Sequence, residues 1–257
     1  MADHSLAGKV VLIGGGAKNL GGLISRELAN AGAAAVVVHY NSGATKSAAE
    51  ETVAAVQAAG AKAVAIQSDL TRPANVTRLF DEALGHFGKI DIAVNTTGMV
   101  IKKPIVEVTE QDYDTIFAVN SKAAFFFLQE AGKKLADNGN IVTIVTSLLA
   151  AYTPFYAIYP GSKAPIEHYT RAASKEFGER GISVVAVGPG PMDTPFFYPA
   201  ESKDSAAYNA SAAALSKRTR SGLTEIQDIA PLVKFLVTDG WWITGQTIFA
   251  NGGYTTR

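Results

Sequence analysis

The sequence has 257 residues, with 23 acidic and 23 basic side chains that give a formal net charge of zero. That balance argues against a surface for nucleic acid, which needs clustered Lys and Arg, and the absence of cysteine excludes disulfides and thiolate chemistry. Residues 1–8 lack the apolar core of a signal peptide and no apolar run approaches the roughly 20 residues of a membrane span, so we expect a cytoplasmic protein without a membrane partner.

Short apolar runs alternate with helical patterns along the whole chain. The apolar runs predict strands at residues 9–13, 33–39, 63–67, 90–95, 140–147, 182–187 and 246–250. The patterns between them predict helices at residues 21–31, 45–59, 76–87, 112–120, 122–135, 161–178 and 225–237, of which the fourth and fifth are alternatively one long helix.

The predicted strands do not alternate polar with apolar residues, as is typical of a parallel sheet covered on both faces. We therefore predict an α/β chain, a single-domain doubly wound Rossmann fold over residues 1–257 with a central parallel sheet and helices on both faces. The composition changes at about residues 191–222, which are rich in Pro, Ala and Ser. This stretch is predicted to be a lid over the substrate, and we call it the lid segment.

Glycines gather where the first predicted strand ends, from Gly14 to Gly22. Glycine allows positive φ and lets the backbone approach a ligand closely. The helix that follows presents free N–H groups and a positive dipole end, which suit a pyrophosphate. The position after the first strand of an α/β chain is that of a dinucleotide-binding turn.

The end of the second predicted strand indicates which dinucleotide binds. NAD sites usually place an acid there to hold the ribose 2′-hydroxyl, whereas this chain has His39, Tyr40, Asn41 and Ser42. The lack of an acid admits a 2′-phosphate, and Lys18 with Asn41 and Ser42 could bind it. We therefore expect NADP(H); the alternative is that Lys18 is only a solvated loop lysine.

Tyr159 and Lys163 are four residues apart, a spacing that places both on one face of a helix. A nearby cation lowers the pKa of a phenol toward neutral pH, and Ser147, twelve residues upstream, could hold a substrate oxygen beside it. Such a group moves a proton on or off a carbonyl or alcohol oxygen. Thr146 is the rival hydroxyl, and an aromatic ring packed under a lysine stem is the non-catalytic alternative.

With these motifs the chain resembles the classical short-chain dehydrogenase/reductase family over essentially its whole length. The motifs that carry the resemblance stand in the family's order: Gly14 to Gly21, Asp69, Asn95 to Gly98, Asn120, Ser147, Tyr159, Lys163, Pro189, Gly190 and Thr194. Some positions depart from the family, since Gly14 replaces a threonine, Asn19 a glycine, and Thr96 and Thr97 an asparagine and an alanine.

The resemblance implies hydride transfer between a nicotinamide and a carbonyl carbon, with Tyr159 as the proton donor. Its implied catalytic set is Asn120, Ser147, Tyr159 and Lys163. The cofactor contacts expected from the turn, the strand ends and the family are Gly15, Lys18, Asn19, Leu20, Gly21, His39, Tyr40, Asn41, Ser42, Asp69, Leu70, Asn95, Thr96, Gly98, Tyr159, Lys163, Pro189, Gly190, Met192 and Thr194. The family also implies a homotetramer, for which residues 125–127 and 241–242 are candidate interfaces.

A largely apolar substrate pocket is expected from Phe155, Tyr156, Met192, Phe196, Phe197 and Tyr198. Such a lining favours a hydrophobic ketone, so the leading hypothesis is an NADPH-dependent carbonyl reductase. One alternative is a 3-oxoacyl-thioester reductase fed by an acyl carrier protein, for which Lys102 and Lys103 could form a basic patch. Another is a non-catalytic NADP-binding protein. The four histidines lack metal-ligand spacing, so no metal is expected.

Overall fold

A seven-stranded parallel sheet forms the centre of the computed structural model, which describes residues 4–256. Residues 1–3, within the stretch predicted not to be a signal peptide, and residue 257 lie outside the described residues. The strand order is β3-β2-β1-β4-β5-β6-β7, and every neighbouring pair runs parallel. The predicted doubly wound fold is confirmed, with the reversal of strand order between β1 and β4.

Each predicted strand is present with ends shifted by up to three residues. The strands are β1 (Val10–Gly14), β2 (Ala35–Tyr40), β3 (Lys62–Gln67), β4 (Ile92–Asn95), β5 (Asn140–Ile144), β6 (Ser183–Pro189) and β7 (Thr247–Ala250). The helices are α1 (Asn19–Asn30), α2 (Lys46–Ala58), α3 (Pro73–Phe87), α4 (Glu110–Phe117), α5 (Ala123–Lys134), α6 (Ile158–Lys163), α7 (Pro165–Glu176), α8 (Lys203–Ala212) and α9 (Ile226–Leu236).

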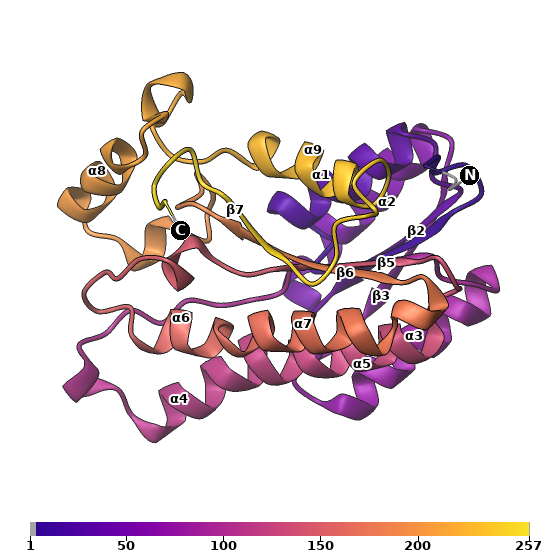
Figure 1. Ribbon diagram of the computed structural model, residues 1–257, viewed down its shortest axis with the longest axis horizontal. Coiled ribbons are helices and arrows are strands. Elements are labelled where there is room, and N and C mark those ends of the chain that lie inside the picture. Colours follow the sequence, from indigo (N-terminus) through magenta and orange to yellow (C-terminus); the bar gives the residue numbers. More distant parts are fainter. Residues whose placement is uncertain (1–3, 257) are drawn as a thin grey trace.

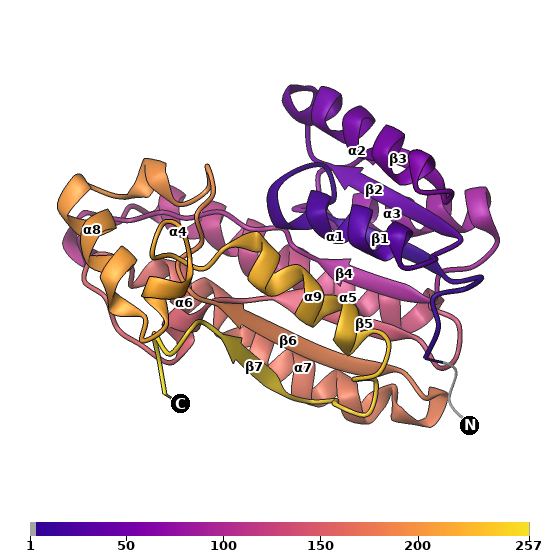
Figure 2. The same cartoon turned by 90° about the horizontal axis from the view of Figure 1, so that it is seen from above.

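Helices cover both faces of the sheet, as the continuous apolar strands require. Figure 1 shows α3, α5 and α7 on one face and α1, α2 and α9 on the other. Seen from above in Figure 2, α8 and the rest of the lid segment extend from one end of the sheet, beside α4 and α6. No helix among residues 4–256 combines the length and apolar character needed to cross a membrane.

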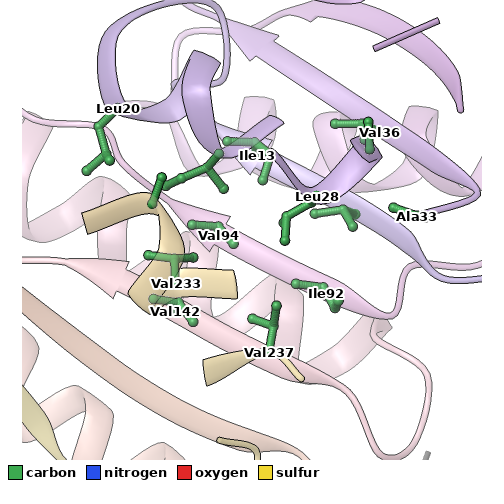
Figure 3. Packing of buried hydrophobic residues seen from close by; sticks show 14 of the residues in the cluster. Ile13, Leu20, Leu28, Ala33, Val36, Ile92, Val94, Val142, Val233 and Val237 are labelled. Carbon is green, nitrogen blue, oxygen red and sulfur yellow. The ribbon is translucent and has the colours of Figure 1, made fainter. Parts of the chain in front are cut away.

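The two faces bury separate hydrophobic clusters. Under α1 and α9, side chains from neighbouring strands meet those of the helices, as Figure 3 shows for Val94, Leu28 and Val233. On the other face Phe80 and Phe127 pack edge to face with their ring centroids 5.0 Å apart. Burying one such side chain contributes roughly 1.5–3 kcal/mol, so the two clusters hold the strand ends in fixed positions.

A π-helical turn (Ala118–Lys122) joins α4 and α5, so the two predicted helices follow one another without a loop. Thr109 and Asp112 form a capping box that starts α4. π-turns often mark functional positions, and this one carries the predicted catalytic Asn120. The sequence pattern did not reveal it.

Three predicted boundaries in the catalytic half were wrong. β5 ends at Ile144 rather than at residue 147. Ser147 instead begins a 3₁₀ turn, which is capped by the Thr146 hydroxyl because that oxygen accepts the Leu148 N–H. The helix predicted from residue 161 begins at Ile158 and stops before Pro165, which starts α7. Proline is tolerated at that first position because its missing N–H has no partner there.

The lid segment also contains a helix, α8, that its composition did not predict. Its start is capped by the Ser202 hydroxyl, which accepts the Ser205 N–H at 3.2 Å. The helix has almost no apolar stripe, so hydrophobic periodicity could not have found it.

Candidate active site

The turn between β1 and α1 requires glycine at two positions. Gly15 has φ +77°, and a Cβ on Gly21 would lie 2.2 Å from the Gly15 carbonyl oxygen. Asn19 adopts φ 49°, which asparagine tolerates better than most residues. The turn therefore survives the replacement of the family's glycine at position 19, and it brings backbone N–H groups to the start of α1.

His39 holds this turn in place. Its Nδ1 accepts the Gly15 N–H at 2.9 Å, and its Nε2 lies 2.7 Å from the Ser68 carbonyl oxygen, to which it donates. The ring is 2 % exposed, and burial lowers the pKa of His39 to about 4, against the opposing effect of the Ser68 hydrogen bond. The neutral imidazole thus connects the ends of β1, β2 and β3.

A cavity of about 480 Å³ opens at the carboxyl ends of these strands, at the reversal of strand order where α/β proteins bind dinucleotides. Most of the predicted cofactor residues line it: Gly15, Lys18, Asn19, Leu20, Gly21, His39, Tyr40, Asn41, Asp69, Leu70, Thr96, Gly98, Tyr159, Lys163, Met192 and Thr194. The cavity and its glycine turn fit an extended dinucleotide with a pyrophosphate at the start of α1.

Four of the predicted cofactor contacts lie outside the lining of this cavity. Pro189 and Gly190 line the adjacent pocket instead, and Ser42 precedes a 3₁₀ turn. Asn95 is buried at the end of β4, where its Oδ1 accepts from the Thr97 N–H and hydroxyl. The Asn95 side chain thus orders the loop after β4, and its predicted contact with the cofactor stays a prediction.

Several residues that line the cofactor cavity were not predicted from the sequence, among them Thr45, Thr71, Thr97 and Met99. Each follows the carboxyl end of β2, β3 or β4 by a few residues. The rule that ligands bind beyond the carboxyl ends of parallel strands is the signal that would have included them.

Lys163 is a buried ammonium at the end of α6. It is 4 % exposed, and its Nζ donates to the carbonyl oxygens of Thr97 and Ile144, both at 3.1 Å. Burial lowers the pKa of Lys163 to about 8. A lysine with this pKa is still mostly protonated at neutral pH, so it supplies positive charge beside the cofactor cavity.

Asn120 reaches the same place from the π-turn. Its Oδ1 accepts the Met99 N–H at 2.8 Å, and its Nδ2 donates to the Met99 carbonyl and to the Ser162 hydroxyl, both at 2.9 Å. Ser162 in turn donates to the Tyr159 carbonyl. The amide therefore ties α6 to the loop after β4.

Tyr159 borders both the cofactor cavity and a second, smaller pocket lined by Ser147. Burial raises the pKa of Tyr159 to about 12, and a hydrogen bond with the Thr146 hydroxyl opposes that shift. The phenol is therefore neutral at pH 7. Thr146, the rival in the sequence, contacts Tyr159, while Ser147 and Thr146 both line the smaller pocket.

The smaller pocket is mostly apolar, as predicted, with Tyr156, Met192, Phe196 and Phe197 in its lining. For two residues, Phe155 and Tyr198, the predicted place in the pocket lining was wrong. Phe155 has φ 70° and is half exposed, and Tyr198 turns its hydroxyl to Asp193 at 2.6 Å. Tyr254 and Asn209 take part instead; no local pattern marks them, because only the fold brings them here.

Comparison with known proteins agrees with this geometry. A family model described as enoyl-(acyl carrier protein) reductase matches residues 15–255. Hydroxynaphthalene reductase-like protein Arp2 of Metarhizium brunneum is 39 % identical, over 98 % of this chain and 97 % of that protein. The short chain dehydrogenase/reductase AacuN of Aspergillus aculeatus is 34 % identical over 98 % of this chain and 97 % of its own.

Two solved structures are also similar to this chain. A putative dehydrogenase from Burkholderia cenocepacia with bound NADP has a TM-score of 0.99 and 66 % identity, over 100 % of this chain and 97 % of that one. A blue fluorescent protein from a metagenomic library, in complex with NADPH, has a TM-score of 0.90 and 33 % identity, over 98 % and 100 % of the two chains. The chain belongs to the short-chain dehydrogenase/reductase family and is an oxidoreductase of that family.

Replacing Gly21 by Ala tests the fit of the turn. The added Cβ meets backbone at 2.2 Å, so the turn must shift, and we expect NADPH to bind at least about 30-fold more weakly, a loss of ~2 kcal/mol. Fluorescence titration measures the affinity. Gly85→Ala is the control, because its Cβ would meet nothing within 4 Å; an affinity of Gly21→Ala within threefold of that control would contradict the assignment.

The buried His39 predicts a pH dependence of stability. Because the pKa of His39 falls from 6.5 in the unfolded chain to about 4 in the fold, its contribution is complete above pH 6.5. It is lost as the pH falls toward 4, by up to about 3 kcal/mol. Urea unfolding measured from pH 7 to pH 4 should therefore show that the free energy of unfolding falls more steeply for the wild type than for His39→Gln. Parallel curves for the two proteins would refute the contribution of His39.

Proposed function

We propose that this protein is an NADPH-dependent reductase of ketones, in which Tyr159 donates the proton to the carbonyl oxygen. The observation that carries the proposal is that Tyr159 borders both cavities, with Ser147 in the wall of the smaller one. A carbonyl carbon in the smaller pocket would adjoin the nicotinamide in the larger one. The cofactor would supply the hydride, and the protein the proton and the orientation.

The protonation state of Tyr159 fits the role of proton donor. With a pKa raised to about 12 by burial, the phenol carries its proton at neutral pH and can act as a general acid. Ser147 would donate a hydrogen bond to the same carbonyl oxygen and stabilise the charge that develops on it.

Lys163 and Asn120 would support this acid. The Lys163 ammonium is held by two carbonyl oxygens at the cofactor cavity, where it would bind nicotinamide ribose hydroxyls and stabilise the phenolate left after proton transfer. Asn120 would maintain the loop and helix geometry through its bonds to Met99 and Ser162. The role of Asn120 in a water relay stays a prediction.

The cofactor is NADP(H), which is also bound in two of the similar structures. The lining residues at the end of β2 include Asn41 and no acid, Lys18 lines the same cavity, and the carboxylate in the lining, Asp69, follows β3. Lys18 forms no ion pair within residues 4–256, so its charge is available to a 2′-phosphate.

We infer a hydrophobic or aromatic ketone as the substrate, since Phe196, Phe197 and Tyr156 line the pocket and several relatives are named hydroxynaphthalene reductase-like. The acyl-carrier alternative relied on Lys102 and Lys103 as a basic patch. Lys102 pairs with Glu201 at 2.7 Å and Lys103 with Asp112 at 2.6 Å, so these charges are neutralised. A cytoplasmic homotetramer remains part of the proposal, with the exposed Phe125 and Trp242 as candidate contacts.

Tyr159→Phe tests the acid directly. The variant keeps the ring and loses the proton, so we expect kcat/KM to fall at least about 1000-fold, or ~4 kcal/mol in barrier. NADPH affinity should stay within threefold. Steady-state NADPH oxidation with an aryl ketone measures the first and fluorescence titration the second. Tyr152→Phe, at an exposed tyrosine, is the control; turnover by Tyr159→Phe within tenfold of it would remove Tyr159 as the acid.

A further inference from the structure

A carboxylate is buried at the base of the lid segment. Glu201 lies just before α8, and its side chain is 0 % exposed. Its Oε2 accepts from Lys102 Nζ at 2.7 Å and from the Ser205 hydroxyl, while its Oε1 accepts from the Tyr156 hydroxyl. Both oxygens are thereby satisfied by side chains from three separate parts of the chain.

The donors belong to the two loops that frame the substrate pocket. Lys102 lies in the loop after β4 and Tyr156 in the loop before α6. The backbone joins these loops, because the Lys103 N–H donates to the Phe155 carbonyl at 2.8 Å. The Lys102 ammonium also lies 4.8 Å from the centroid of the Tyr156 ring, a cation–π contact. Glu201 adds the lid segment to this pair of loops.

Tyr156 connects the cluster to the reaction centre. It lines the substrate pocket, its ring centroid is 6.1 Å from that of Tyr159, and its carbonyl accepts the Tyr159 N–H at 2.9 Å. Burial and the Glu201 carboxylate both raise the pKa of Tyr156, so its hydroxyl remains a donor. Glu201 therefore fixes the position of a side chain in the pocket wall.

Lys102 and Glu201 form a close and largely buried ion pair. Burial by itself would raise the pKa of Glu201, but the hydrogen bonds from Lys102, Ser205 and Tyr156 outweigh it and hold that pKa below its usual value. Removing one partner of a buried pair leaves an uncompensated charge, whereas removing both is much less disruptive. The two single variants and the double variant thus have distinguishable consequences.

We propose that Glu201 is a positioning residue that sets substrate specificity: it fastens the lid segment to both pocket loops and fixes Tyr156 as part of the pocket wall. The role of Glu201 in substrate specificity rests on the proposed ketone reduction. Its role in fastening the lid segment to the pocket loops does not depend on any substrate, so the two roles are measured separately.

Limited proteolysis measures the fastening without any substrate. The lid segment offers trypsin Lys203, Lys217, Arg218 and Arg220, and cleavage of a native protein follows local opening. We expect trypsin to cut the lid segment of Glu201→Gln about tenfold faster than that of the wild type. The double variant, Lys102→Met with Glu201→Gln, should be cut more slowly than Glu201→Gln alone, because it leaves no unpaired buried charge. Mass spectrometry identifies the cuts.

Lys103→Met is the matched control, because Lys103 also pairs with a carboxylate but with Asp112 of α4 instead of the lid segment. Cleavage of this variant at the wild-type rate, beside faster cleavage of Glu201→Gln, supports the fastening. Equal cleavage of Glu201→Gln and wild type would overturn it. A double variant cut faster than either single variant would overturn the pairing of Lys102 with Glu201.

Kinetics measures the specificity. We expect the kcat/KM ratio of a one-ring to a two-ring aryl methyl ketone to change at least about fivefold in Glu201→Gln and Tyr156→Phe, mainly through KM. Lys103→Met should keep the wild-type ratio. An unchanged ratio in Glu201→Gln would overturn the assignment of specificity. Failure of wild type to reduce any ketone would instead count against the proposed function, and the trypsin comparison would still decide the fastening.

Discussion

The arrangement around Tyr159 depends on one buried ammonium. Lys163 Nζ bonds the Thr97 carbonyl after β4 and the Ile144 carbonyl at the end of β5, and so fixes α6 against both strands. A buried lysine without such partners would be costly. Because Tyr159 lies one helical turn before Lys163, the same bonds set where the phenol meets the two cavities.

The parallel sheet positions the loops that surround the Lys163 ammonium. Parallel strands end together at one edge, and the reversal of order between β1 and β4 leaves a crevice there. His39 holds the glycine turn on one side of the crevice, and Asn120 holds the loop after β4 on the other. His39 and Asn120 therefore fix the backbone on the two sides of this crevice.

Strand–helix alternation and the glycine turn were enough to predict the fold, because both are local patterns. Motif order and spacing likewise placed Tyr159, Lys163 and most of the predicted cofactor residues in the walls of one cavity; that they contact a cofactor stays a prediction. The Glu201 cluster could not be predicted, since Lys102 and Glu201 meet only through the fold. The orientation of Phe155 depends on a positive φ that the sequence did not signal. Tyr159 was expected to have a lowered pKa, but burial outweighs the Thr146 hydrogen bond and raises that pKa.

The most direct measurement follows a labelled hydride. NADPH carrying deuterium at both C4 positions of the nicotinamide is incubated with the enzyme and an aryl ketone, with labelled NADH in parallel, and the alcohol is analysed by mass spectrometry. We predict one deuterium on the carbinol carbon and a kcat/KM for NADPH at least about tenfold above that for NADH. An alcohol without deuterium, or a preference for NADH, would contradict it.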